Sequence, residues 1–164
     1  MDYSNKSESL KHIELSGLSE EEMIYGLLFA VSNKLQASAD RMLPDITSRQ
    51  HFLLIVLSLF KDKHPSLKEV AEVIGSSYQN VKKLADSLEK KGFIELRQDE
   101  HDKRKCNLLV TDKVLSLTKV IDEEAENFMQ DLYKGISKND LRHVIAVLTQ
   151  MELNLSTKTK GARL

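Results

Sequence analysis

Two short stretches of this chain, residues 76–83 and residues 102–105, are rich in side chains that can contact bases and phosphates. In the first stretch these residues are Ser76, Ser77, Tyr78, Gln79, Asn80, Lys82 and Lys83. In the second they are Asp102, Lys103, Arg104 and Lys105. Glutamine can pair with an adenine edge, lysine can reach base edges or phosphates, and a tyrosine hydroxyl can reach a phosphate. These residue types suit nucleic-acid binding if the elements that carry them present them on one surface.

The first stretch opens a predicted helix that has one apolar stripe. At about 100° per residue, Leu84, Ala85 and Leu88 fall within about 60° of Val81, so the four side chains should be buried together. The opposite half of the helix is polar and carries Gln79, Lys82, Lys83, Asp86 and Lys90. Ser76 and Ser77 can cap its first turn, whose positive end would face a phosphate backbone.

The residues before this helix predict the first half of a helix-turn-helix. A short amphipathic helix is indicated by Leu67, Val70, Ala71 and Ile74. Ala71 is small enough for two helices to cross closely, Gly75 allows a sharp turn, and Val81 can pack back on the first helix. Any tight helical corner can show this spacing, so a plain corner and a DNA-binding motif stay equally open on it alone.

A hairpin with a charged tip is predicted directly after the second helix. Residues 93–97 and 106–111 are strand-compatible, and residues 98–105 between them are polar. A helix-turn-helix followed by such a hairpin is the winged form of the motif. Basic residues slightly outnumber acidic ones between Ser77 and Lys105, but composition alone would favour an ordinary solvated surface.

The hairpin also resembles one protein family, the multiple-antibiotic-resistance-type regulators known as the MarR family. Its wing signature is Asp, any residue, Arg, five residues, an aliphatic residue and Thr, which here are Asp102, Arg104, Val110 and Thr111. The segment 84–95 is similar to the family's passage from recognition helix to wing, and the resemblance covers roughly residues 19–155. One departure is Val114, because the family usually has glycine soon after the Thr.

The resemblance implies a DNA-binding transcriptional regulator, most often a repressor, that acts as a homodimer on a near-palindromic operator. It implies that Arg104 enters the minor groove, that Asp102 holds the wing through a salt bridge, and that Lys103 and Lys105 bind phosphates. Members of the family commonly release DNA when a small-molecule effector binds. The sequence does not identify that effector, the operator or the regulated genes.

We expect a mainly α fold with a small two-stranded β wing, in which a winged helix-turn-helix lobe joins a helical dimerisation lobe. Capping boxes and apolar spacing predict helices over 19–43, 47–60, 112–133 and 138–155, and the second of these should be the buried central helix. The predicted organisation is an N-terminal arm (1–18), one domain (19–155) and a frayed basic tail (156–164). Within the domain, dimerisation helices (19–46 and 112–155) flank the DNA-binding lobe (47–111).

The last predicted helix carries an apolar seam that calls for a partner helix. Its spacing is close to a heptad repeat over Leu141, Ile145, Leu148, Met151 and Leu155. Together with the resemblance, this seam predicts the dimer interface.

Other chemistry finds little support in the sequence. The five histidines show no ligand spacing, and no nucleophile elbow, phosphate loop or paired carboxylates appear, so we expect no metal, no cofactor and no catalysis. Cys106 has two interpretations: a half-buried strand residue, which we favour, or a thiol whose pKa is lowered by its basic neighbours and which acts as a redox switch.

The composition excludes some classes of protein. The net charge of −1 excludes a protein whose whole surface is basic. The single cysteine excludes an intrachain disulfide and favours a reducing compartment. With a polar N-terminus and no long apolar run, a cytoplasmic protein without membrane attachment is expected. Two alternatives stay open: a winged-helix module that docks a protein, and a thiol or ligand sensor that does not bind DNA.

Overall fold

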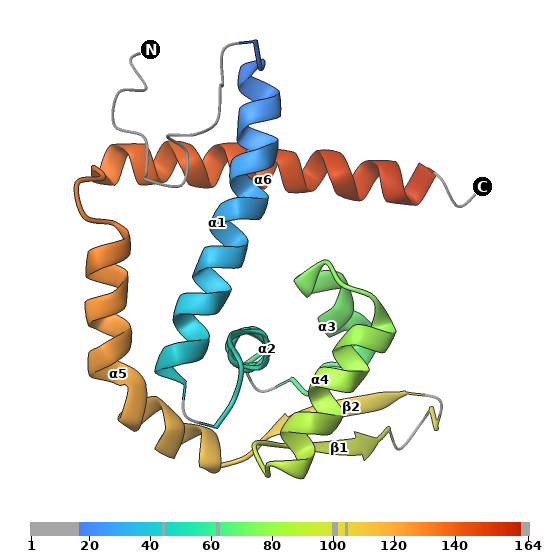
Figure 1. Ribbon diagram of the computed structural model, residues 1–164. Helices are drawn as coiled ribbons and strands as arrows, with labels where there is room; N and C mark the ends of the chain where they lie inside the picture. Colours follow the sequence, from blue (N-terminus) through green and yellow to red (C-terminus); the bar gives the residue numbers. More distant parts are fainter. Residues whose placement is uncertain (1–16, 44, 62, 100–101, 104, 162–164) are drawn as a thin grey trace. The chain divides into compact units, whose positions relative to one another are not determined.

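A computed structural model describes residues 17–43, 45–61, 63–99, 102–103 and 105–161 (Figure 1). These residues form six helices and one two-stranded sheet. The elements are α1 (Glu20–Met42), α2 (Ser48–Leu59), α3 (Leu67–Ile74), α4 (Tyr78–Lys90), β1 (Ile94–Gln98), β2 (Cys106–Val110), α5 (Lys113–Leu132) and α6 (Lys138–Gly161). The chain divides into two compact units, residues 1–121 and residues 122–164. The mainly α fold with a small β wing is confirmed.

Three helix starts follow the predicted capping boxes. Ser19, Thr47 and Ser66 each accept a hydrogen bond from the backbone N–H three residues later, and the Glu or Gln there accepts from the cap in return. Such caps satisfy orphan N–H groups and stabilise a helix by about 0.5–2 kcal/mol each. At the other end of α3, Gly75 adopts a φ of 69°, which a residue with a Cβ rarely adopts. The predicted turn between α3 and α4 is therefore confirmed.

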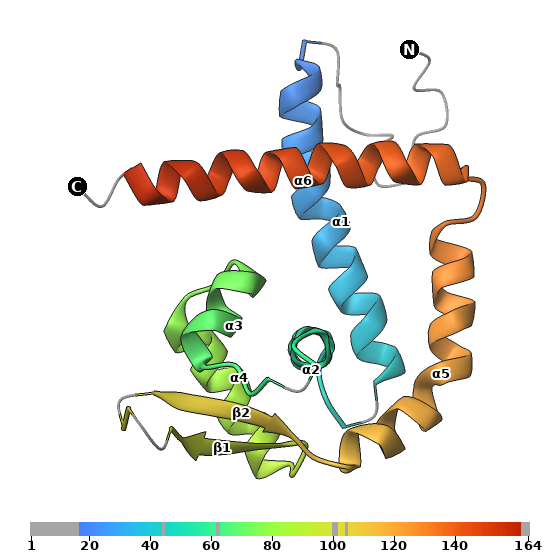
Figure 2. The same cartoon turned by 180° about the vertical axis from the view of Figure 1, so that it is seen from behind.

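The core of the first unit lies between α2, α3, α4 and the sheet. Leu84 of the predicted stripe of α4 is only partly buried against this core. The buried residues from α4, its neighbours and one side of the hairpin include Leu53, Leu67, Val70, Val81, Ala85, Leu88, Phe93, Ile94 and Leu108. Both views show α4 alongside the hairpin, and α4 contacts β1 and α3 (Figures 1 and 2). Burial of each large apolar side chain contributes about 1.5–3 kcal/mol, so this core fixes the orientation of α4.

The prediction that the helix after Thr47 is the buried central helix holds for one side of it and is wrong for the other. Leu53 and Leu57 of α2 are buried, but Phe52 and Ile55 are 48% and 44% exposed. The apolar run 52–57 goes all round the helix, because successive residues advance about 100°. The core covers only one side of it.

The hairpin is antiparallel, with Ile94 opposite Val110 and Gln98 opposite Cys106. Its base is tied down by Thr111, whose hydroxyl donates to the carbonyls of Gly92 (2.7 Å) and Phe93 (3.1 Å). The departure from the family at Val114 is accommodated, since Val114 is half-buried against the core near the start of α5.

The second unit contains residues 122–132 of α5 and all of α6. The prediction of a frayed tail that begins at residue 156 is wrong. The helix continues through residues 156–161 instead of fraying after Leu155. Ser156 donates to Glu152 Oε1 (2.6 Å) and Thr157 donates to the Leu153 carbonyl (3.1 Å), so these hydroxyls are satisfied within the helix. Loss of apolar spacing does not end a helix when no proline or glycine intervenes and lysine, a good helix former, follows.

Within the described residues, no helix combines the length and apolar character that a membrane-spanning segment requires.

Candidate nucleic-acid interface

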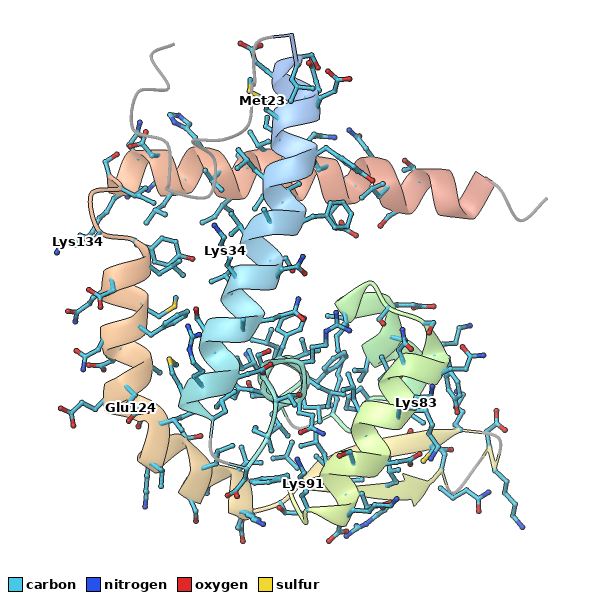
Figure 3. All side chains as sticks on the ribbon, in the orientation of Figure 1. Met23, Lys34, Lys83, Lys91, Glu124 and Lys134 are labelled. Atoms are coloured by element: carbon cyan, nitrogen blue, oxygen red, sulfur yellow. The ribbon has the colours of Figure 1, made fainter. Side chains whose placement is uncertain are left out.

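The polar half of α4 is presented to solvent as the sequence predicts. Tyr78, Gln79, Asn80 and Lys83 are exposed, while Val81 on the opposite side is fully buried. Figure 3 labels Lys83 on this helix. The exposed side chains share a rigid surface because the buried stripe holds the helix in place.

Of the two predicted capping serines, Ser77 is the N-cap of α4. Its hydroxyl accepts a hydrogen bond from the backbone N–H of Asn80 (3.2 Å). Ser76 instead belongs to the turn, where its N–H donates to the Ala71 carbonyl (3.0 Å). Ser77 thus begins a helix whose remaining N-terminal N–H groups can face an anion.

Lys82 is not a free cation on this surface. It donates to Asp86 Oδ1 one turn further along α4 and forms an ion pair with it. The hydrogen bond to Asp86 is the main cause that raises the pKa of Lys82 above its ordinary value. Both residues were predicted on the same half of the helix but not as a pair, although their i,i+4 spacing could have indicated it.

A polar cluster ties the end of α4 to α2. Gln50 is buried; its Nε2 donates to Ser87 Oγ (2.8 Å), and its Oε1 accepts from Lys91 Nζ (3.1 Å). Lys91, labelled in Figure 3, also donates to the backbone carbonyl of Asp45 (2.6 Å). Sequence reasoning found Gln50 only as part of a capping box, because its long-range partners depend on tertiary packing.

The tip of the hairpin is organised by Asp99, which the sequence analysis did not single out. Asp99 Oδ1 accepts from the N–H of Asp102 (2.9 Å), and Oδ2 accepts from the side chain of Asn107 (2.9 Å). Gln98 Nε2 donates to the carbonyl of Lys103 (2.6 Å). An aspartate that accepts from a backbone N–H shortly after it is a common turn-forming device, and Asp99 at the end of a strand could have suggested it.

The predicted wing residues are placed in part. Lys103 and Lys105 are exposed at the tip, and Asp102 is half-buried there. Arg104 lies outside the described residues. The salt bridge expected of Asp102 stays a prediction.

Cys106 does not have the activated thiol of the redox interpretation. The residue is partly buried and packs against the core. Burial raises the pKa of its thiol, the nearby Lys82 acts in the opposite direction, and Glu89 and Asp86 add to the increase. The suggestion of a lowered pKa is therefore wrong, because burial outweighs the basic residues.

The described residues contain no group of three or more His, Cys, Asp or Glu side chains that could hold a metal ion. The first unit therefore contains a capped helix, α4, with an exposed polar face, beside a hairpin that carries lysines at its tip.

Residues 45–105, which include that helix and the first strand of the hairpin, match the sequence model described as MarR family. Over these residues the chain resembles the MarR family. Over 142 residues it is 25% identical to the transcriptional repressor MprA of Escherichia coli, an alignment that covers 81% of each chain.

Solved structures of other proteins share the fold. A MarR protein from Peptoclostridium difficile superposes with a TM-score of 0.77 at 20% identity, covering 93% of this chain and 98% of that one. MepR of S. aureus, solved in complex with DNA, gives a TM-score of 0.70 at 25% identity, covering 80% of this chain and 97% of MepR.

Proposed function

We propose that this chain is a sequence-specific DNA-binding transcriptional repressor. The observation that carries the proposal is the exposed polar half of α4, held rigid by Val81, Ala85 and Leu88 in the core. Support comes from the DNA complex of MepR and the repressor function of MprA, two relatives of this chain.

In this proposal α4 enters the major groove. Its first turns carry the sequence-reading side chains, with Gln79 and Lys83 directed to base edges. Ser76, Ser77, Tyr78 and Asn80 lie where the helix start meets the phosphate backbone. Lys103 and Lys105 of the wing bind phosphates, and Arg104 enters the minor groove.

We further propose that the repressor is a homodimer. The seam of α6 supports this, because Ile145 is 64% and Leu148 42% exposed, and no residue of α6 is among the buried residues of the described chain. With Leu141, Met151 and Leu155, they form an apolar surface that a second copy can cover. A two-fold dimer presents two copies of α4 to successive major grooves, so its operator has half-sites about 10 bp apart.

A small-molecule effector that releases the DNA remains part of the proposal on the strength of the family resemblance. Its chemical class is left open.

The test is binding of the purified protein to the duplex upstream of its own gene, with Gln79→Ala and Lys83→Ala as probes. Both variants should bind this duplex more weakly than the parent, by about 1–3 kcal/mol per half-site for a residue that reads a base. Lys134→Ala removes an exposed lysine of the second unit and serves as the control (Figure 3). A parent protein that binds no duplex but captures a protein partner would replace this proposal with the protein-docking alternative.

A further inference from the structure

The Lys82–Asp86 pair places a negative charge on the half of α4 that is to face DNA. Each of the two side chains keeps 41% of its surface exposed, so the pair lies at the surface of the helix and not in the core. A phosphate that approaches Lys82 must compete with the carboxylate for its ammonium group and is repelled by Asp86. The pair therefore weakens the electrostatic attraction of α4 to DNA of any sequence.

The same pair orients the lysine. An ammonium group has three N–H donors. With one donor engaged by Asp86, two are left in a restricted set of directions, as a base edge with acceptor atoms requires. Lys82 lies in the second turn of α4, within the part of a recognition helix that reaches base edges, whereas Asp86 lies one turn further on.

We propose that Asp86 is a positioning residue that sets the sequence specificity of α4. It holds the ammonium of Lys82 for base-edge acceptors and withholds its charge from the phosphates of unrelated duplexes. The inference rests on the proposed function, because it requires α4 to lie in the major groove.

The experiment compares parent, Asp86→Asn and Asp86→Glu on two duplexes. One is the sequence that the parent selects from a random library, and the other is its scrambled version. Asp86→Asn frees one cation per protomer. Its affinity for scrambled duplex should therefore rise by about fivefold per protomer near 0.15 M salt, with a salt slope steeper by about one unit per protomer. The selected duplex should gain less, so the selected-to-scrambled affinity ratio falls.

Two further variants separate the proposed cause from general charge. Asp86→Glu keeps a carboxylate within reach of Lys82 and should preserve the affinity ratio. Glu124→Gln makes the same change in net charge at an exposed residue of α5 and should also preserve it (Figure 3). In a Lys82→Gln background, Asp86→Asn should no longer change the ratio.

An unchanged ratio in Asp86→Asn, or an equal effect of that substitution with and without Lys82, would overturn the inference. Those results leave the proposed function intact, because the parent still selects a duplex. A parent that selects no sequence from the library refutes the proposed function itself. Thermal melting of each variant checks that the exposed pair has been changed without unfolding the lobe.

Discussion

Helices α4 and α6 both carry regular apolar residues, but only α4 buries them within its own unit. Val81, Ala85 and Leu88 of α4 are each 0% exposed, whereas Ile145 of α6 is 64% exposed. A periodic stripe therefore shows that a helix needs a partner, without showing whether that partner lies in the same unit. In α4 the buried stripe orients the polar face that is proposed to bind DNA. In α6 the exposed apolar seam is itself the surface that is proposed to bind a second copy.

The largest effect should come from the stripe of α4. Leu88→Ala leaves a cavity in the core and should lower the free energy of unfolding by about 2–5 kcal/mol, measured by urea denaturation. The control is Leu115→Ala on α5, where the leucine is 65% exposed, and its change should stay within about 0.5 kcal/mol. Equal losses of unfolding free energy in the two variants would contradict the placement of the α4 stripe in the core.

The corresponding change in α6 should alter association. Ile145→Asp places a charge in the apolar seam and should convert a dimer into the 18.7 kDa monomer at micromolar concentration in sedimentation. Gln150→Glu adds the same charge at an exposed polar residue of α6 and should leave the dimer intact. A parent protein that sediments only as a monomer would contradict the predicted dimer.

The polar cluster at the end of α4 sharpens the comparison, because it shows a second way in which α4 is held. Ser87→Ala leaves the buried Nε2 of Gln50 without this acceptor and should cost about 1–3 kcal/mol in urea denaturation. Ser156→Ala on α6 also removes a hydroxyl, but its bond to Glu152 is exposed, so the loss should be much smaller. A negligible loss for Ser87→Ala would show that packing alone holds α4.

The smallest effect is expected at Cys106, beside α4. Cys106→Ser should bind DNA like the parent, and peroxide should not change binding by the parent. Because burial raises the pKa of this thiol, the thiolate forms at higher pH than in an ordinary cysteine. Alkylation of Cys106 should therefore stay slower than that of a free thiol at pH 7–8 and increase only at higher pH. Release of DNA by oxidant from the parent, but not from the mutant, would restore the redox interpretation.

Local patterns predicted much of this molecule. The capping boxes at Ser19, Thr47 and Ser66, the turn at Gly75 and the stripe of α4 are encoded by residues close in sequence, and the structure confirms them. The wing motif resembles that of the MarR family, and the sequence model of that family matches residues 45–105.

What the sequence did not predict depends on side chains that meet only after folding or on competing local interactions. The contacts of Gln50 with Ser87 and Lys91 join residues far apart in the chain. The pKa of Cys106 depends on how deeply its strand is buried, which nearby basic residues do not indicate. The helix continues beyond Leu155 although the apolar spacing ends there, because the next residues are compatible with a helix.

The central claim is that α4 selects the DNA sequence while the wing adds general affinity. A salt titration of duplex binding tests it most directly, with parent, Gln79→Ala and Arg104→Ala on the selected and scrambled duplexes. Arg104→Ala should weaken binding to both duplexes and flatten the salt dependence by about one unit per half-site. Gln79→Ala should weaken binding to the selected duplex by about 1–3 kcal/mol per half-site and change binding to the scrambled one much less. If Arg104→Ala left both affinities and the salt slope unchanged, or Gln79→Ala weakened binding to both duplexes equally, the account would be contradicted.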